Sequence, residues 1–310
     1  MTDFTPFINR LKKNARHLNK WAKRRGISCY RLYDRDIPEF PLALDWYEGR
    51  IHLQEFAKPE NSFADETGLL SEAIGGALEI PPENIVFKTR ERQRGLSQYE
   101  KSGKRSGDFV VHEGGLKFLA NLERYLDTGL FLDHRQTRAM VRDQSAGKRF
   151  LNLFAYTASF TVYAADGGAS SSVTVDLSNT YQKWSKRNFE LNGMNLKKHQ
   201  LIRADVFSFL SKAKNKNEKF DLIVMDPPSF SNSKMMDEVL DVQRDHMRLI
   251  QGCLDILSPG GELFFSNNLR RFKLDPALEK FTLTEDISGQ TQPEDFKRRK
   301  PHHCWRIRRR

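Results

Sequence analysis

This 310-residue sequence lacks the features that mark secreted and membrane proteins. Its three cysteines, Cys29, Cys253 and Cys304, lie far apart, and their odd number argues against a disulfide framework. It contains no apolar run long enough to cross a bilayer and no signal-peptide pattern at its start. We therefore expect a soluble, cytoplasmic protein with no membrane partner.

Acidic residues are fewer than basic ones. The sequence has 51 Lys and Arg residues against 40 Asp and Glu residues, which gives a formal net charge of +11. Such an excess suits a polyanionic partner such as nucleic acid. A basic protein can also simply be a soluble one, so charge alone leaves both interpretations open.

Two common nucleotide-binding signatures are missing as well. The sequence contains neither a P-loop nor a G-x-G-x-x-G turn. The segment where such a turn is expected, residues 151–160, has no basic residue to face a pyrophosphate. The pattern therefore argues against a bound triphosphate or dinucleotide.

Residues 1 to about 130 predict a small α+β domain with mostly antiparallel strands. Apolar residues recur at helical spacing from Phe7 to Trp21, and Gly26 is a typical helix stop. A hairpin is predicted over residues 110–122, with Gly114-Gly115 at its turn. Further short strands are predicted at residues 29–33, 50–56 and 84–88.

From about residue 131 to residue 310, short strand patterns alternate with helical patterns. This alternation predicts a mostly parallel, doubly wound, Rossmann-like sheet with helices on both faces. The predicted strands are residues 149–154, 172–177, 200–204, 220–225 and 262–266, and the predicted helices include residues 180–192 and 239–257. Residues 281–285 and 303–307 are predicted to form an antiparallel edge pair. The Lys-rich segment 210–219 is interpreted as a solvated loop, and residues 258–261 as a helix breaker.

Acidic residues follow three successive strands of this predicted sheet. Asp176, Asp205 and Asp226 each end a strand, at the edge where open α/β sheets bind ligands. Asp176 is suited to accept hydrogen bonds from ribose hydroxyls, and Asp205 from an adenine amino group. S-adenosylmethionine fits this pattern because it has a ribose and an adenine but no phosphate. The loop at residues 154–160, taken alone, is better explained as a plain strand-to-helix turn.

The most informative motif is Asp226-Pro227-Pro228-Ser229-Phe230. The prolines fix φ and leave backbone carbonyls exposed, and the phenylalanine offers a stacking face. Together with the carboxylate they are suited to holding a flat ring beside a polar edge. An ordinary Pro-Pro turn is the alternative.

Residues 149–268 resemble the class I S-adenosylmethionine-dependent methyltransferases. The resemblance rests on the ordered motifs Asn152-Leu153-Phe154-Ala155-Tyr156-Thr157, Val175-Asp176, Ala204-Asp205-Val206 and Asp226-Pro227-Pro228-Ser229-Phe230. Nearly the whole chain is similar to the large-subunit rRNA methyltransferases, most closely to the guanine-N7 half of the bifunctional RlmKL enzymes. Supporting segments are residues 9–11, 29–34, 88–93, 129–135, 230–234 and 243–246.

This resemblance implies methylation of N7 of a guanine in 23S rRNA, or in a precursor of the large ribosomal subunit. It implies S-adenosylmethionine as the cofactor. The fused enzymes carry a guanine-N2 methyltransferase half ahead of this region. That half is absent from this sequence, and it is a candidate partner.

The motifs and the resemblance together give a set of candidate site residues. The catalytic candidates are Asp226, Pro227, Pro228 and Phe230. The cofactor-binding candidates are Phe131, Asp133, Arg135, Asn152, Phe154, Ala155, Tyr156, Thr157, Asp176, Leu177, Asp205, Val206 and Asp226. Arg135 is suited to pair with the methionine carboxylate, and a structural Asp–Arg pair joining the two domains is the alternative.

Guanine N7 has an in-plane lone pair, so it needs no deprotonation before it attacks a methyl group. The task of such an enzyme is then mostly positioning. We assign Asp226 and the Pro227 carbonyl to the polar edge of the base, and Phe230 to its face. The target guanine must be splayed out of any helix.

Three other functions stay open as alternatives. Cytosine-C5 methylation needs a thiolate, but Ser266-Asn267-Asn268 stands where that branch has a cysteine, and Cys253 is predicted to lie in the core. Exocyclic-amine methylation uses a similar motif without the intervening Ser229. A non-catalytic RNA-binding or ribosome assembly factor on the same fold would explain the glycine-poor loop.

No metal site is predicted, although His302, His303 and Cys304 are consecutive. Adjacent side chains alternate across a strand, and the sequence shows no second ligand cluster.

Basic residues gather in three clusters that we expect to contact RNA. They lie in the helix from Arg10 to Arg25, between Lys88 and Arg105, and in the tail from residue 297 to 310. A solvated basic surface is the alternative in each case. The RNA-binding candidates are Arg10, Lys13, Lys88, Arg90, Arg92, Arg94, Tyr99, Lys104 and Arg105, with Tyr99 as a base-stacking residue.

Overall fold

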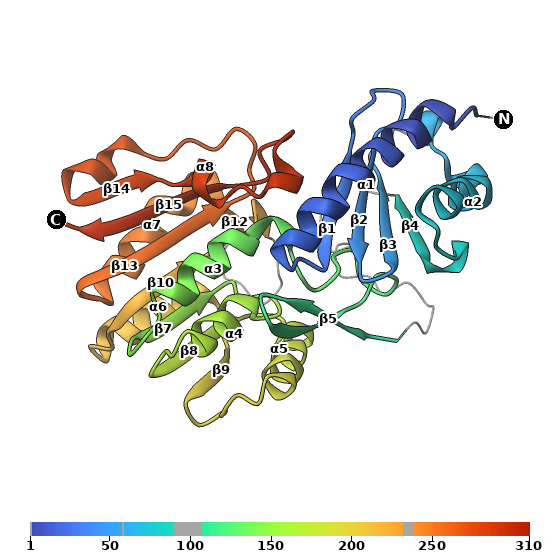
Figure 1. Cartoon of the computed structure of the whole chain (residues 1–310). Helices are drawn as coiled ribbons and strands as arrows, with labels where there is room; N and C mark the ends of the chain where they lie inside the picture. The colour runs from blue at the N-terminus through green and yellow to red at the C-terminus, as the bar shows by residue number, and fades with distance from the viewer. Residues whose placement is uncertain (1, 58, 90–106, 232–238) are drawn as a thin grey trace. The chain divides into compact units, whose positions relative to one another are not determined.

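The structure is a computed structural model that describes residues 2–57, 59–89, 107–231 and 239–310 (Figure 1). The chain divides into two compact units. The first comprises residues 1–115, 120–128 and 294–299, and the second comprises residues 116–119, 129–293 and 300–310. Among the described residues, no helix combines the length and the apolar character that a membrane span requires.

One long basic helix, α1 (Thr5–Arg25), opens the first unit. Phe7, Leu11 and Leu18 recur at helical spacing and are buried, while Lys12, Lys13 and Arg16 between them are exposed. The helix ends at Gly26, which has a φ of 63°. Glycine adopts this left-handed conformation without strain, so the helix stop lies where the sequence predicted it.

The first unit contains a sheet with the strand order β1-β2-β3-β4. The bounds of its strands are β1 (Cys29–Asp34), β2 (Leu42–Tyr47), β3 (Arg50–Glu55) and β4 (Ile85–Thr89). β1, β2 and β3 pair antiparallel, and β4 is parallel to β3. α1 and α2 (Thr67–Leu78) lie beside this sheet (Figure 1). Their apolar side chains share one core with it. The mostly antiparallel character is confirmed, whereas β2 and α2 were not predicted.

The predicted hairpin is present as β5 (Phe109–Glu113) and β6 (Leu116–Ala120), which form a two-stranded sheet. Gly114 and Gly115 lie at its turn with φ values of 60° and 84°. Positive φ at two successive residues is what a tight hairpin turn requires.

The second unit contains a sheet with the strand order β14-β15-β13-β10-β7-β8-β9. Its strands are β7 (Arg149–Leu153), β8 (Ser171–Asp176), β9 (His199–Arg203), β10 (Phe220–Met225), β13 (Leu257–Asn267), β14 (Thr282–Asp286) and β15 (His303–Arg309). The strands from β13 to β9 are parallel, and β15 pairs antiparallel with both β13 and β14. The predicted Rossmann-like sheet with an antiparallel edge is confirmed.

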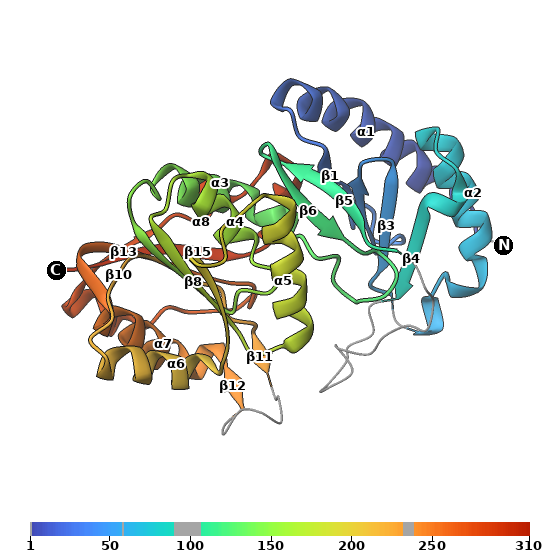
Figure 2. The same cartoon turned by 90° about the horizontal axis from the view of Figure 1, so that it is seen from below.

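Helices cover both faces of this sheet (Figure 2). Their bounds are α3 (Arg135–Asp143), α4 (Ser159–Asp166), α5 (Asn179–Leu191), α6 (Val206–Asn215), α7 (Val242–Asp255) and α8 (Ser288–Thr291). Successive residues of a strand face opposite sides: Ile223 packs with α6 and α7, and Val224 packs with α3 and α4. Burial on both faces explains why residues 220–225 are continuously apolar apart from Asp221.

Two predictions in this unit are wrong. Residues 210–215 belong to α6 instead of a solvated loop, because Phe209, Leu210 and Ala213 bury one face of the helix. β13 begins at Leu257, so residues 258–261 lie inside the strand rather than between a helix and the strand. The pairing with β10 shifts register between Phe220 and Leu222, which accommodates those extra residues. Two short strands, β11 (Phe230–Ser231) and β12 (Leu240–Asp241), form a small separate pair.

Gly167 allows α3 and α4 to approach closely. A Cβ at this position would lie 2.1 Å from the carbonyl oxygen of Arg142. We expect Gly167→Ala to destabilise the fold by about 1–3 kcal/mol through overpacking. Gly289→Ala is the control because a Cβ there meets nothing within 4 Å. Urea denaturation measures both variants, and an unchanged midpoint for Gly167→Ala would contradict this packing.

Candidate active site

The candidate site lies at the carboxyl edge of the parallel strands. β10, β7, β8 and β9 are neighbours in that order and run in the same direction. Leu153 of β7 is level with Met225 of β10 on one side and with Val175 of β8 on the other. Asp226 and Asp176 therefore lie at the same level along the carboxyl edge. Their strands are separated by two inter-strand spacings, which is about 10 Å.

The loop after β7 turns without a glycine. Phe154, Tyr156 and Ala158 have φ values of 55°, 53° and 63°, in the left-handed region. Each such residue costs about 1–3 kcal/mol of backbone strain and persists only where its surroundings hold it. The absence of glycine, which made the cofactor loop look weak in the sequence, is thus compatible with a sharply turned loop.

Hydrogen bonds to β8 hold this loop. The N–H of Tyr156 donates to Oδ2 of Asp176 at 2.8 Å, and the N–H of Ala155 donates to the carbonyl of Val175 at 3.1 Å. The hydroxyl of Thr157, a buried residue, donates to the carbonyl of Gly129 at 2.6 Å. The loop is therefore fixed from two directions.

Asp176 accepts a second backbone hydrogen bond, from the N–H of Ser178 at 2.8 Å, through its other oxygen. Burial raises the pKa of Asp176 to about 6, and the N–H groups of Ser178 and Tyr156 oppose that rise. Leu177 follows it, half-buried, and its carbonyl accepts a hydrogen bond from Arg203. The carboxyl thus lies between the strand end and the turned loop.

Asp205 has a structural role that the sequence did not predict. It is the N-cap of α6, and its Oδ1 accepts the N–H of Ser208 at 2.9 Å. Val206 is buried at the start of that helix. The cap engages Oδ1, which leaves Oδ2 for the predicted adenine contact.

Asp226 follows β10 and is bound from two other elements of the second unit. Its Oδ1 accepts the hydroxyl hydrogen of Ser266, on β13, at 2.6 Å. Its Oδ2 lies 3.5 Å from Nε2 of His134. The side chain of Asp226 keeps 27% of its surface exposed, so it is open to a ligand on one side.

The rest of the Asp-Pro-Pro-Ser-Phe motif places an aromatic ring in solvent. Pro227 is buried and Pro228 is exposed. Ser229 donates its hydroxyl hydrogen to Oδ1 of Asn268 at 2.7 Å. Phe230 is 52% exposed, which is unusual for a phenylalanine and is what a base-stacking residue requires.

Phe131 and Asp133 lie just ahead of α3, and Arg135 begins this helix. The ring of Phe131 is 41% exposed, and its centroid lies 5.0 Å from that of Tyr156 in the loop after β7. The carbonyl of Phe131 accepts a hydrogen bond from the buried guanidinium of Arg138 at 2.8 Å. Arg135 is buried at the first position of α3. The two carboxyl-edge loops are thus joined by aromatic packing.

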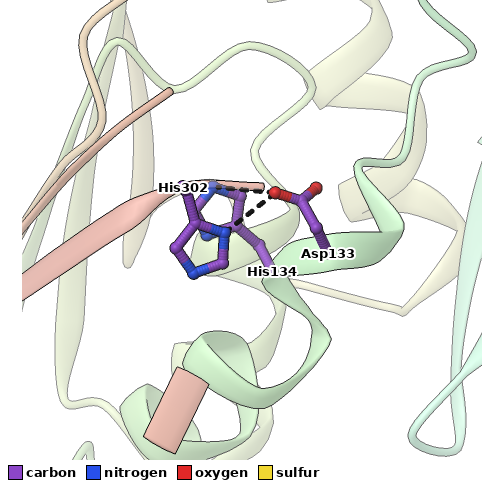
Figure 3. Close-up of side chains that lie close together, drawn as sticks. All are labelled: Asp133, His134 and His302. Carbon is purple, nitrogen blue, oxygen red and sulfur yellow. Dashed lines mark hydrogen bonds and ion pairs between the residues drawn. The ribbon is translucent and has the colours of Figure 1, made fainter. Parts of the chain in front are cut away.

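Asp133 forms a cluster with two histidines, His134 and His302 (Figure 3). Nδ1 of His302 is 2.9 Å from Oδ2 of Asp133, and Nε2 of His134 is 3.8 Å from the same oxygen. The imidazole rings stack at 4.2 Å with an interplanar angle of 12°. An ion in the plane of one ring would lie outside the plane of the other, so this arrangement favours hydrogen bonding over metal ligation.

Asn152 has a different environment from the one that the sequence suggested. It is buried inside β7, and its Nδ2 donates to Oγ1 of Thr161 on α4 at 3.0 Å. Its amide therefore faces a helix that covers the sheet.

Among the RNA-binding candidates, the described ones belong to the first unit. Lys13 is exposed on α1, whereas Arg10 is half-buried, with its Nε 3.4 Å from Oδ2 of Asp36. Both residues line a cavity of this unit. Lys88 donates to the carbonyl of Tyr125, and burial lowers its pKa to about 8. The remaining candidates lie outside the described residues: Arg90, Arg92, Arg94, Tyr99, Lys104 and Arg105.

The structure adds site residues that sequence reasoning missed. His134 stands between two predicted residues in the Asp133-His134-Arg135 motif, so that motif offered a signal. Ser266 was considered only as a replacement for a cysteine. His302 is 169 positions from its partner Asp133, and no local pattern links them.

Comparisons with known proteins identify the family of this chain. A family model of S-adenosylmethionine-dependent methyltransferases matches residues 21–296. The chain is 58% identical to ribosomal RNA large subunit methyltransferase K of Neisseria meningitidis, over 99% of this chain and 88% of that protein. It is 49% identical to ribosomal RNA large subunit methyltransferase K/L of Marinobacter nauticus, over 97% of this chain and 42% of that protein.

A solved structure of a putative methyltransferase complexed with SAH also matches. The TM-score is 0.78 at 26% identity, and the match covers 99% of this chain and 82% of that chain. The resemblance inferred from the sequence is confirmed. The chain therefore belongs to the S-adenosylmethionine-dependent methyltransferases, in the family of ribosomal RNA large subunit methyltransferase K, and its cofactor is S-adenosylmethionine.

Proposed function

We propose that this chain methylates N7 of a guanine in 23S rRNA, as free RNA or in a precursor of the large ribosomal subunit. The observation that supports the proposal most directly is the arrangement of side chains at the end of β10. There the partly exposed carboxylate of Asp226 and the exposed ring of Phe230 belong to one short motif. The name of the Neisseria relative supports rRNA of the large subunit as the substrate.

The residues of the carboxyl edge suit the cofactor. S-adenosylmethionine supplies, when bound, a methyl group on a positively charged sulfur. Asp176 would accept from its ribose hydroxyls and Asp205 from its adenine amino group, on adjacent strand ends. Phe131 and Tyr156 supply apolar surface beside the loop, and Arg135 would hold the methionine carboxylate. No phosphate needs to be accommodated, which fits a loop without basic residues.

The protein's part in the reaction is mainly orientation. N7 of guanine attacks through a lone pair, so no side chain has to remove a proton first. Asp226 and the Pro227 carbonyl would bind the polar edge of the base, and Phe230 would stack on its face. A base splayed out of its helix can present both surfaces at once.

The described thiols do not support cytosine-C5 chemistry. Cys29, Cys253 and Cys304 are all buried. Burial raises the pKa of the Cys253 and Cys304 thiols far above neutrality, which keeps them protonated. A thiolate nucleophile is therefore not provided at the carboxyl edge by these residues.

The first unit would bind RNA through the basic face of α1. Its exposed cations are Lys12, Lys13, Arg16, Lys20, Lys23, Arg24 and Arg25. No acidic residue occurs between Thr5 and Arg25, so the face has one sign of charge. The K/L relative is longer than this chain, and a guanine-N2 methyltransferase half of that kind is a proposed partner.

The product of the reaction tests the proposed function. We expect the protein to transfer a labelled methyl group to 23S rRNA from cells that lack it, and mass mapping to give N7-methylguanosine. Methylation at cytosine C5 or at an exocyclic amine would contradict the base assignment. Cofactor binding without transfer to any rRNA would favour the non-catalytic assembly factor.

Cofactor affinity should depend on the charge of Asp176. We expect Asp176→Asn to weaken S-adenosylmethionine binding by about ten- to a hundredfold, because ribose hydroxyls lose an ionised acceptor. For the same reason, affinity of the unmodified protein should fall as the pH drops through about 6. Calorimetric titration between pH 8 and about pH 5 measures both effects.

Asp221→Asn is the matched control for this substitution. Asp221 also accepts a backbone N–H, from Arg149 at 2.8 Å, but at the opposite end of the same strands. Equal losses of affinity in both variants would refute the role of Asp176.

The folding stability of the cofactor-free protein should show the reverse pH trend. The raised pKa of Asp176 contributes stability that is fully present below its ordinary value of 3.8 and is lost as the pH rises through about 6.

Salt dependence tests the role of α1. Arg16 and Lys20 are exposed and four residues apart, as are Lys212 and Lys216 in the second unit. We expect the double variant Arg16→Gln/Lys20→Gln to weaken rRNA binding and to lower the slope of log K against log salt by about 1–2. Cofactor affinity should not change. If Lys212→Gln/Lys216→Gln weakened RNA binding equally, the assignment to α1 would fail.

A further inference from the structure

The carboxylate of Asp226 is held by two side chains for which the proposed function has no use. Ser266 donates to Oδ1 at 2.6 Å, and Nε2 of His134 faces Oδ2 at 3.5 Å. An ionised carboxylate has about four lone-pair positions, two on each oxygen. Ser266 uses one position on Oδ1, and the ring of His134 lies beside Oδ2, so positions remain on both oxygens for a ligand.

The environment of His134 determines which of its nitrogens carries the hydrogen. Nε2 faces two carboxylates, Asp226 at 3.5 Å and Asp133 at 3.8 Å, and carboxylates only accept. Nδ1 is buried and has no hydrogen-bond partner among the described residues. We therefore assign the hydrogen of the neutral ring to Nε2, the nitrogen on the side of the two acids.

His134 cannot easily turn away from this position. Its ring stacks on that of His302, with centroids 4.2 Å apart (Figure 3). It also forms a T-shaped contact with the ring of Phe160, with centroids 5.6 Å apart. His302 is fixed at both nitrogens, by Asp133 at 2.9 Å and by Thr291 at 3.0 Å. The ring that faces Asp226 is thus supported by a second ring that is itself anchored at both ends.

We propose that His134 is a positioning residue: it orients Asp226 so that the carboxylate accepts both N1–H and N2–H of the target guanine. This inference rests on the proposed function for the identity of the base. Guanine presents two parallel donors on that edge, and a carboxylate matches two parallel donors. Adenine has an acceptor at N1, which would face the same negative oxygens, so adenine is rejected.

Charge adds a second reason for a neutral His134. In the transfer, the N7 lone pair forms the bond to the methyl carbon, the sulfur keeps the pair of the broken bond, and the positive charge passes to the base. No proton moves. A negative Asp226 stabilises the cationic base as it forms, provided that its neighbour does not already neutralise it.

Four charged or titratable groups surround His134: Asp226 after β10, Asp133 ahead of α3, His302 ahead of β15 and Arg138 within α3. Burial and then His302 lower the pKa of His134, while Asp226 and Asp133 raise it. The ring is therefore neutral at pH 7 and gains its charge only in acid. Protonation would then pair it with Asp226 and weaken the hold on the base.

Steady-state kinetics on 23S rRNA with His134→Ala and His134→Gln test the proposal. The Gln amide places a donor at about the reach of Nε2 but does not titrate. We expect His134→Ala to lower kcat by about ten- to a hundredfold with unchanged S-adenosylmethionine affinity. His134→Gln should recover most of kcat. Because glutamine does not titrate, kcat of this variant should fall less steeply in acid than kcat of the unmodified protein.

His199→Ala is the matched control. His199 is another buried histidine of the second unit, bonded to Ser172 at 2.9 Å at the beginning of the parallel strands. Its removal should lower the melting temperature but leave the pH–rate profile unchanged. The proposal is overturned if His134→Gln is as inactive as His134→Ala while both remain folded, or if its acid limb is unchanged.

These outcomes are distinct from failure of the proposed function. If the unmodified protein methylates an atom other than guanine N7, the proposed function fails first, and this inference fails with it. If the unmodified protein methylates guanine N7 and both His134 variants keep full activity, only the role of His134 is wrong.

Discussion

The hydrogen bond from the N–H of Tyr156 to the carboxylate of Asp176 is the contact on which the candidate site depends. It joins the end of β8 to a loop that holds three residues in left-handed conformations without a glycine. Strain of that kind is stable only when the surrounding structure opposes its release. The same carboxylate is the predicted acceptor for a ribose, so one side chain holds the loop and is also proposed to bind the cofactor.

The other two acids at the carboxyl edge also combine a local hydrogen bond with a proposed ligand contact. Asp205 caps α6 with one oxygen, and Asp226 accepts the hydroxyl hydrogen of Ser266 with one oxygen. In each case a fixed local bond orients the carboxylate and leaves acceptor capacity for a ligand. Orientation established before binding reduces the entropy that binding must remove, and in the proposed guanine-N7 transfer, where no proton has to move, this is the main contribution left to the protein.

The sequence predicted those features that repeat locally. The strand Phe220–Met225 is apolar on both faces and was placed at its observed bounds, and Gly26 ended α1 as expected. α2 was missed because Thr67–Leu78 contains three glycines, and its burial depends on packing against α1. Asp176, Asp205 and Asp226 were predicted as site residues because each lies at the end of a predicted strand. The stacking of His134 on His302 could not be predicted, because the folded sheet determines which segments distant in sequence come into contact.

The most direct test of the central claim is a crystal structure of the protein with S-adenosylhomocysteine. The account predicts that the ribose hydroxyls contact Asp176, that the adenine amino group lies at Asp205, and that Phe154, Tyr156 and Ala158 keep their left-handed φ values. It also predicts that Asp226 borders the same cavity. A ligand bound elsewhere, or a loop at residues 154–158 that rearranges into ordinary conformations when the cofactor binds, would contradict it.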